Sequence, residues 1–120
     1  MPKPELEFAV PAADWTAAGD QVEGIWEQIL SKDPDTGSHT RILRFEPGVD
    51  STANGTLRHE FWEEVFIVAG DLTDLRLGET FTAGMYACRP PGMPHGPWRS
   101  AEGVLMVEFR YGYPPKGADT

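Results

Sequence analysis

The order of hydrophobic and polar residues along the chain predicts a series of short β-strands. The clearest segment covers residues 57–69, where side chains alternate between two faces with a period of two. One face carries His59, Phe61, Glu63, Val65 and Ile67, and the other carries Glu60, Trp62, Glu64, Phe66 and Val68. We therefore predict a central strand in which a polar beginning precedes an apolar body.

Further strands are predicted on both sides of this segment, from runs rich in β-branched and apolar residues. They are expected at 39–45, 72–77, 85–89 and 104–111. The 13 glycines and 11 prolines favour many turns. Reversals are expected at 70–71, 78–84 and 90–92. Together these features predict an all-β fold.

Residues 22–32 fit two patterns. Ile25, Trp26, Ile29 and Leu30 have the spacing of a helix face, yet the segment also fits a strand that leads into a turn. We predict the strand, paired as a hairpin with the strand at 39–45. The expected divisions are an N-terminal extended segment with the first strands (1–37), a core (38–112) and a C-terminal tail (113–120).

Composition and charge exclude several classes of partner. With 120 residues the chain has the length of one domain, and its net charge of −9 argues against binding to nucleic acid. No signal peptide is visible and no apolar run is long enough to cross a membrane, so a cytoplasmic location is expected. The single cysteine, Cys88, excludes an internal disulfide, and we expect it to be inert and buried.

Three side chains have the chemistry of a metal site. His59 and Glu63 are four residues apart on the predicted central strand and therefore share a face, while His95 follows a rigid segment rich in proline. Two imidazoles and one carboxylate form a facial set that leaves coordination positions open for substrate or oxygen. The spacing alone does not establish that the three converge, and an exposed ion pair is the alternative for His59 and Glu63.

The second half of the chain resembles a motif of the cupin superfamily. Gly84, Pro90, Gly92 and His95 match every fixed position of the pattern G-x5-P-x-G-x2-H. The chain departs from the pattern at its closing Asn, where Arg99 stands.

The segment before it resembles the end of the first cupin motif. Glu63 and Gly70 fit the pattern E-x6-G, and His59 occupies the second histidine position of that motif. Leu57 stands at the first histidine position, so the resemblance implies three ligands in place of four. The resemblance as a whole covers roughly residues 38–112.

Within the cupins, the chain resembles the ChrR-like group, which includes the metal-binding domain of an anti-sigma factor and is similar to acetylacetone dioxygenase. The runs that carry this resemblance are 62–66 and 89–97. It implies a single-domain, RmlC-like β-barrel or jelly roll, a homodimer, and a divalent metal held by His59, Glu63 and His95. Iron(II) is the expected metal, with zinc, nickel and manganese as alternatives, and His39 on a neighbouring strand is a candidate fourth ligand.

Other side chains are candidates for contact with a substrate. Phe61 is expected to point into the barrel with the ligands, and Leu57 and Trp98 are expected to line the same pocket. For the aromatic residues, packing in the core or at an interface is the alternative. Glu63 and Tyr86 are the candidate catalytic residues, and for Tyr86 core packing is again the alternative.

Three arginines lie in predicted strands, at positions 41, 44 and 110. An unpaired guanidinium is costly to bury, so we expect pairing with Glu46 or Glu108. Contact between one of these arginines and an anionic substrate is the alternative.

The resemblance implies a metal-dependent enzyme that acts on a small organic molecule. The first expectation is an iron(II) dioxygenase that uses O2 to cleave a carbon–carbon bond in a β-dicarbonyl-like or hydroxylated aromatic compound. A non-redox isomerase or lyase that uses zinc, nickel or manganese is one alternative. A sensor module that binds a metal or ligand without turnover is the other.

Overall fold

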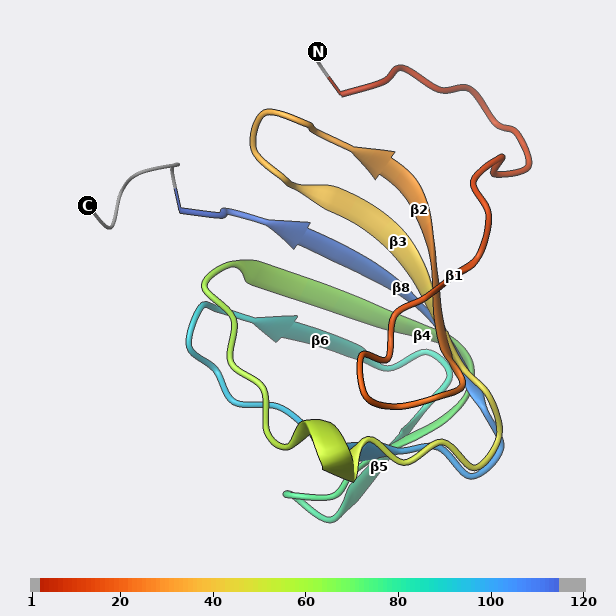
Figure 1. Cartoon of the computed structure of the whole chain (residues 1–120), viewed down its shortest axis with the longest axis vertical. Helices are drawn as coiled ribbons and strands as arrows, with labels where there is room; N and C mark the ends of the chain where they lie inside the picture. The colour runs from red at the N-terminus through yellow and green to blue at the C-terminus, as the bar shows by residue number, and fades with distance from the viewer. Residues whose placement is uncertain (1–2, 115–120) are drawn as a thin grey trace.

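The computed structural model describes residues 3–114, and nearly all of its regular elements are β-strands, which confirms the all-β prediction (Figure 1). A single turn of 3-10 helix, η1 (Thr52–Asn54), lies between β3 and β4. The strands are β1 (Thr16–Ala17), β2 (Ile25–Lys32), β3 (His39–Phe45), β4 (Trp62–Asp74), β5 (Glu79–Thr82), β6 (Tyr86–Arg89), β7 (Trp98–Arg99) and β8 (Val104–Tyr111).

The strands form an antiparallel sheet of eight strands organised around β4. The order is β1-β2-β3-β8-β4-β5, and β6 and β7 also pair with β4. The first part of β4 lies between β8 and β6, whereas its last four residues pair with β5 and β7. Figure 1 shows β2, β3, β8, β4 and β6 side by side, with β5 turned away from them.

A bulge and a glycine allow β4 to bend between these two sets of partners. The register with β8 shifts between Ile67 and Ala69, and Gly70 follows with a φ of 91°. A Cβ atom on Gly70 would lie 1.9 Å from the carbonyl oxygen of Gly103, so only glycine permits this approach. The chain therefore continues as a strand to Asp74, and the reversal predicted at 70–71 is wrong.

Two other predicted boundaries also differ. β4 begins at Trp62, so residues 57–61 form a loop before the strand rather than its first part. β5 lies inside the segment predicted to be only a reversal, at 78–84. The predicted hairpin of β2 and β3 is confirmed, as is the strand at β8. These errors share a cause, because the alternating pattern shows which face a side chain takes but not where backbone pairing begins.

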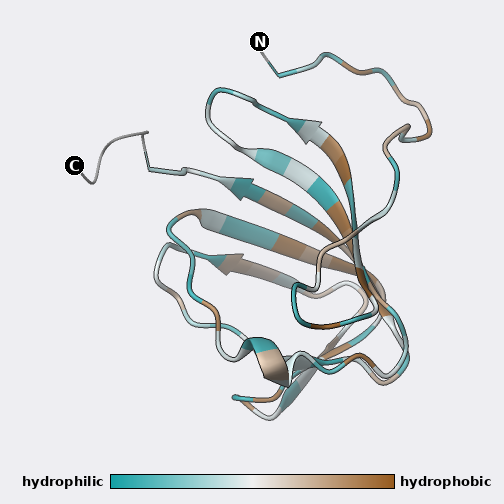
Figure 2. Cartoon of the chain, in the orientation of Figure 1, coloured by the Kyte–Doolittle hydropathy of each residue, from teal (hydrophilic) through white to brown (hydrophobic). Residues whose placement is uncertain are grey.

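The core fills the concave side of the sheet, and Ile25 on β2 contributes to it, so residues 1–37 supply part of the core. Its buried hydrophobic residues are Ile25, Leu43, Phe45, Val49, Val65, Ile67, Leu72, Trp98, Val104 and Met106. Figure 2 shows hydrophobic residues gathered where the strands converge, while the opposite ends of β3, β8 and β4 are more hydrophilic. In the described part of the chain, no helix has the length and hydrophobicity that crossing a membrane requires. Residues 115–120 of the predicted tail lie outside the described residues.

Candidate metal centre

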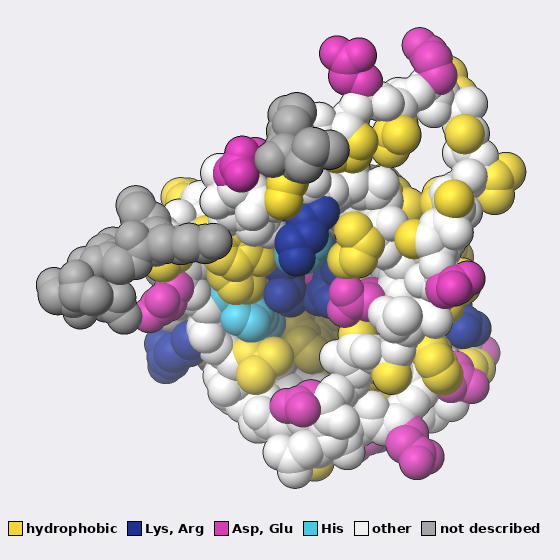
Figure 3. Space-filling view, turned by 45° about the horizontal axis from the view of Figure 1, so that its top comes forward, with side chains coloured by type: hydrophobic (Ala, Val, Ile, Leu, Met, Phe, Trp, Pro, Cys, Tyr) yellow, Lys and Arg dark blue, Asp and Glu magenta, His cyan; other side chains and the backbone are white. Residues whose placement is uncertain are grey.

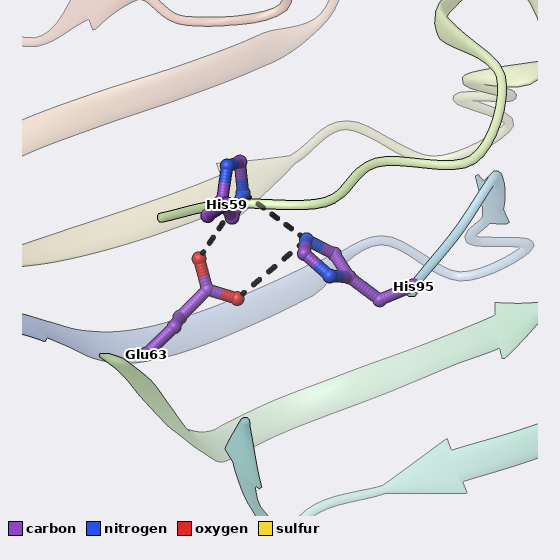
Figure 4. A group of neighbouring side chains, drawn as sticks. All are labelled: His59, Glu63 and His95. Carbon is purple, nitrogen blue, oxygen red and sulfur yellow. Dashed lines mark hydrogen bonds and ion pairs between the residues drawn. The ribbon is translucent and has the colours of Figure 1, made fainter. Parts of the chain in front are cut away.

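The three predicted ligands come together at the hydrophilic end of the sheet (Figure 4). Glu63 is the second residue of β4 and points to the concave side, where it is 3 % exposed. His59 reaches it from the loop before β4, and His95 reaches it from the loop before β7. Backbone hydrogen bonds in both directions between Leu57 and His95 join these two loops. The loops are thereby fixed to each other before any ion binds.

The distances between the three side chains suit a shared ion. Nε2 of His59 lies 3.2 Å from Nε2 of His95. The Glu63 carboxylate oxygens lie 3.7 Å from the His59 Nε2 and 3.9 Å from the His95 Nε2. Two nitrogens that bind one ion at about 2.1 Å are themselves separated by roughly 3.0–3.4 Å. Among residues 3–114, these three side chains form the group whose potential ligand atoms lie close enough to one another to hold one ion.

Sheet register places a guanidinium on each side of Glu63. The partner of Glu63 on β6 is Arg89, and its partner on β8 is Arg110. Because directly paired residues project from the same face, all three side chains point to the concave side. Nη1 of Arg89 donates to Oε1 of Glu63 at 2.8 Å, and Nη2 of Arg110 lies 3.1 Å from Oε2.

One carboxylate oxygen of Glu63 is left available. The Arg110 contact does not have hydrogen-bond geometry, and Oε2 is buried with its hydrogen-bonding capacity unused. A buried oxygen without a hydrogen bond is unfavourable unless another ligand satisfies it. An orphaned carboxylate oxygen beside two imidazole nitrogens is the donor set of a divalent metal. The residues present therefore fit a divalent metal ion.

A second buried carboxylate, Glu108, joins this network on the next strand. Its Oε1 accepts hydrogen bonds from Nε of Arg41 at 2.9 Å and from Nε of Arg110 at 2.6 Å. Nη1 of Arg41 donates in turn to Glu27 at 2.9 Å. Burial raises the pKa of Glu108, but Arg41 and Arg110 outweigh that effect and hold it below its ordinary value. The expected pairing of Arg41 and Arg110 with Glu108 is confirmed.

Burial keeps both imidazoles neutral. Desolvation, aided by the nearby Arg89, lowers the pKa of His95 to about 4. Desolvation also lowers the pKa of His59, although the charge of Glu63 opposes the shift. Nδ1 of His95 faces the carbonyl oxygen of Met93 at 3.3 Å, which directs Nε2 toward the centre. Neutral imidazole with a free nitrogen is the form that binds metals.

A cavity of about 130 Å³ opens above the three ligands. Leu57 and Trp98 line it, as predicted from the sequence, together with core residues such as Val65 and Met106. Figure 3 shows a hollow in this face where Lys and Arg side chains gather beside histidine, with hydrophobic side chains around them. The site is thus accessible from outside and apolar along its inner wall.

Phe61 does not follow the predicted parity, because it lies in the loop before β4. Its ring stacks on His59 with a centroid separation of 4.5 Å and an interplanar angle of 12°. The guanidinium of Arg110 lies 4.9 Å from the centroid of the same ring. The ring centroid of Tyr113 lies 4.5 Å from that of Phe61. Phe61 therefore supports a ligand and an arginine of the site.

Tyr86 lies on the opposite face of the sheet from the metal centre. Its side chain is 58 % exposed, and its hydroxyl donates to the carboxylate of Glu64. This exposure contradicts packing in the core, and Tyr86 does not line the cavity above the ligands, so its contact with substrate stays a prediction without support from the geometry. Cys88, which pairs with Glu64 on the neighbouring strand, is also exposed, so the prediction of a buried cysteine is wrong. Tyr86 and Cys88 both lie on the outward face of β6. A strand of four residues is too short for the sequence pattern to show which of its side chains point inward.

Two further candidates lie away from the ligands. Nδ1 of His39 faces the carbonyl oxygen of Gly37 at 2.9 Å, and its ring packs against Tyr113 rather than joining the ligand group. Arg44 is exposed and lies over the ring of Trp15 on the outside. Neither contributes to the cavity.

The sequence reasoning missed the role of Arg89. It lines the cavity, holds Glu63, and lies 5.1 Å from the ring centroid of Trp98. A signal for it existed, because Arg89 is the last residue of a predicted strand that immediately precedes the ligand-bearing loop. Recognising it required the pairing of that strand with β4, which depends on tertiary structure.

Comparison with solved structures reveals the same fold in several proteins. An RmlC-like cupin from Shewanella frigidimarina NCIMB 400 is 18% identical, with 93% of this chain and 96% of that chain covered and a TM-score of 0.68. An acetylacetone dioxygenase from Acinetobacter johnsonii is 21% identical, with coverage of 91% and 76% and a TM-score of 0.70. The polyketide cyclase RemF from Streptomyces resistomycificus is 16% identical, with coverage of 92% and 83% and a TM-score of 0.66.

At these identities the structural likeness establishes the fold, and it confirms the predicted RmlC-like cupin architecture. None of the curated protein sequences compared is similar to this chain. The model of the ChrR cupin-like domain matches residues 5–113, nearly the whole chain, and so also covers the N-terminal segment that lay outside the predicted core. The chain therefore belongs to the ChrR cupin-like domain family.

Proposed function

We propose that this protein is a metal-dependent enzyme that binds a divalent ion through His59, Glu63 and His95 and acts on a small organic molecule. The observation that carries the proposal is the convergence of two imidazoles and an incompletely bonded carboxylate at the base of an accessible cavity. Three protein ligands leave coordination positions for substrate, as catalytic metal sites require.

The preferred reaction is iron(II)-dependent cleavage of a carbon–carbon bond by O2 in a β-dicarbonyl-like or hydroxylated aromatic compound. The fold shared with an acetylacetone dioxygenase supports this choice. Iron(II) in the site would supply Lewis acidity and the capacity to react with oxygen.

The chain's own residues have distinct tasks in this proposal. His59 and His95 present neutral nitrogens, and Leu57 and Trp98 exclude water from the inner wall. Glu63 acts as a ligand held in place by its arginine neighbours, and a role as general base stays an alternative. Tyr86 has no task, because it lies on the other face.

Metal analysis of purified protein tests the site directly. We expect about one ion per chain in the wild type and a loss of metal in His59→Ala and His95→Ala. His39→Ala is the matched control, because that histidine lies outside the ligand group and should leave the metal content unchanged. Equal metal content in all four proteins would show that His59 and His95 do not bind the metal. Oxygen uptake by iron-loaded protein with 1,3-dicarbonyl and phenolic compounds would then test the reaction.

A non-redox reaction with zinc, nickel or manganese is the second candidate, supported by the fold shared with the polyketide cyclase RemF. Turnover of a carbonyl substrate without oxygen would favour it, and strict dependence on oxygen would exclude it. Metal binding without turnover of any compound would instead favour a sensor module, the alternative suggested by the ChrR cupin-like family.

We also propose that the protein forms a homodimer. The outer face of the sheet exposes large apolar side chains on three strands that lie next to one another, which is unusual for a monomer. They include Phe66, Val68, Tyr86 and Phe109. Sedimentation velocity should show a dimer, and Phe66→Asp should produce a monomer. The cytoplasmic location stays a prediction.

A further inference from the structure

Guanidinium groups surround the metal centre. Arg41, Arg89 and Arg110 line the same cavity as the ligands, and their side chains are 9%, 11% and 19% exposed. The carboxylates of Glu63 and Glu108 line it as well. A small cavity thus contains more fixed positive than negative groups, an arrangement that has consequences for what can bind there.

The charges nearly balance before a metal binds. Within the cavity lining, three guanidiniums face two carboxylates, and Glu27 pairs with Arg41 from outside the cavity. A divalent ion at the ligand group adds two positive charges to this balanced set. Uncompensated charge in a buried site is unfavourable, so the occupied centre favours a ligand that brings negative charge.

Glu63 does not neutralise the ion in the usual way. In a facial set the single carboxylate offsets part of the metal charge, but here Arg89 and Arg110 already contact its two oxygens. With the ion bound, the three guanidiniums and the carboxylates of Glu27, Glu63 and Glu108 leave an excess of about two positive charges, counted from the formal charges of these groups. The substrate is the remaining component that can supply the balance.

Arg110 is the guanidinium best placed to meet such a substrate. It is the most exposed of the three, and its Nη2 is near Glu63 without a hydrogen bond, while Nε is occupied by Glu108. Phe61 stacks on His59 and also lies under the Arg110 guanidinium, so this arginine is positioned beside a metal ligand. A planar guanidinium binds a carboxylate through two parallel hydrogen bonds.

We infer that the substrate of this site is a small organic anion, and that Arg110 holds its carboxylate while its other oxygens face His59 and His95. The inference rests on the proposed function and narrows its substrate class to carboxylated dicarbonyl or phenolic compounds. The apolar wall at Leu57 and Trp98 then contacts the carbon skeleton.

A purely structural role for the arginines is the competing explanation, since they also hold Glu63 and Glu108. Both explanations predict that loss of Arg110 weakens the fold. A bound zinc ion by itself favours a charged molecule under both explanations. Only the anion site predicts that Arg110→Gln reduces the preference for a charged molecule over a matched neutral one while zinc stays bound. A binding measurement with a matched neutral molecule therefore separates the two.

The test is calorimetric titration of zinc-loaded protein with malonate and with malonamide, which share a three-carbon 1,3-dicarbonyl skeleton but differ in charge. We expect the wild type to prefer malonate by about 10- to 100-fold, the effect of one or two hydrogen bonds between charged groups. Arg110→Gln should weaken that preference to what the zinc ion itself contributes, whereas Arg110→Lys should weaken it less. Arg44→Gln is the control, because Arg44 lies on the outside. Zinc content is measured before and after each titration.

The outcomes separate the inference from the proposed function. If the wild type binds no zinc, the metal site itself fails. If zinc binds but malonate and malonamide bind equally, or if Arg110→Gln keeps the preference, the anion site is wrong and the metal site stands. Should Arg110→Gln not fold, a weaker preference for malonate in Arg110→Lys than in Arg44→Gln supports the inference, and an equal preference in these two variants contradicts it. Zinc binding that is equal or tighter in Arg110→Gln, together with weaker malonate binding, supports the inference, because removing a positive charge favours a cation.

Discussion

Glu63 and Glu64 are consecutive carboxylates on β4, and the sheet gives them opposite surroundings. Glu63 points to the concave side, between two guanidiniums and beside two imidazoles. Glu64 points outward and accepts hydrogen bonds from the hydroxyls of Tyr86 and Tyr111. These hydrogen bonds, that of Tyr111 first, lower the pKa of Glu64, while Glu64 raises the pKa of Tyr111 to about 12.

The difference shows that neighbours across the strands, rather than residue type, decide what a carboxylate can do. On the outside, neutral hydroxyl donors stabilise the ionised form, and solvent screens its charge. On the inside, fixed positive groups hold a buried carboxylate in one place, with one oxygen free of hydrogen bonds. Only the second arrangement is suited to bind an ion.

The largest expected effect comes from Glu63→Gln compared with Glu64→Gln. Loss of the inner charge leaves Arg89 and Arg110 buried without their shared partner, and we expect the free energy of unfolding to fall by about 3–5 kcal/mol. Metal should be lost as well. Urea denaturation and metal analysis measure the two effects.

The matched variant Glu64→Gln should retain its metal and lose far less stability, because Glu64 is hydrogen-bonded to neutral hydroxyls and its loss leaves no buried guanidinium unpaired. Equal loss of metal in Glu63→Gln and Glu64→Gln would contradict this prediction, because the two faces of β4 would then not differ in metal binding.

Acidification should weaken the metal-free protein through its inner imidazoles. The pKa of His95 is about 4 in the folded state, and the unfolded value is about 6.5, so between these values the unfolded chain binds more protons. The free energy of unfolding should therefore fall by about 3 kcal/mol as the pH decreases from 6.5 to 4. Denaturation at several pH values measures this slope.

His95→Gln isolates the contribution of this histidine, because carboxylates titrate in the same range in both proteins. The variant should show a shallower decrease in stability over the same pH interval. Identical slopes in the variant and the wild type would mean that His95 is not desolvated in the folded protein.

How far the sequence predicts this molecule depends on the kind of information each feature needs. Alternation along β4 correctly placed Glu63, Val65 and Ile67 inside, because side-chain direction in a strand is a local property. The resemblance to the two cupin motifs brought His59 and His95 together with Glu63, as the structure does.

Features that depend on pairing between strands were missed. Arg89 and Arg110 flank Glu63 only because β6 and β8 pair with β4 in this register, which no local pattern encodes. The bend at Gly70 was interpreted as a turn for a similar reason. Its close approach to Gly103, which is distant in the sequence, exists only in the folded chain.

Leu57→His would add a potential metal ligand on the concave side of the sheet. Leu57 lines the cavity, and its backbone pairs with His95, so an imidazole there should approach the ion as a fourth ligand. We expect the dissociation constant for zinc to fall by about tenfold, ~1.4 kcal/mol. Competition with a coloured chelator measures it. Val68→His, on the outer face, is the control and should leave the zinc affinity unchanged.

The smallest effect is expected for Tyr86→Phe, which changes only the outer side. Removal of this hydroxyl deprives Glu64 of one of the two hydrogen bonds that lower its pKa, so the pKa should rise toward its ordinary value while Tyr111 maintains part of the shift. Titration of the Glu64 carboxyl by NMR measures this change. Metal content and any turnover should stay as in the wild type, because the sheet separates Tyr86 from the ligands. A loss of turnover with the metal retained would return Tyr86 to the catalytic role suggested by the sequence, and the two faces of β4 would have to communicate through the strand.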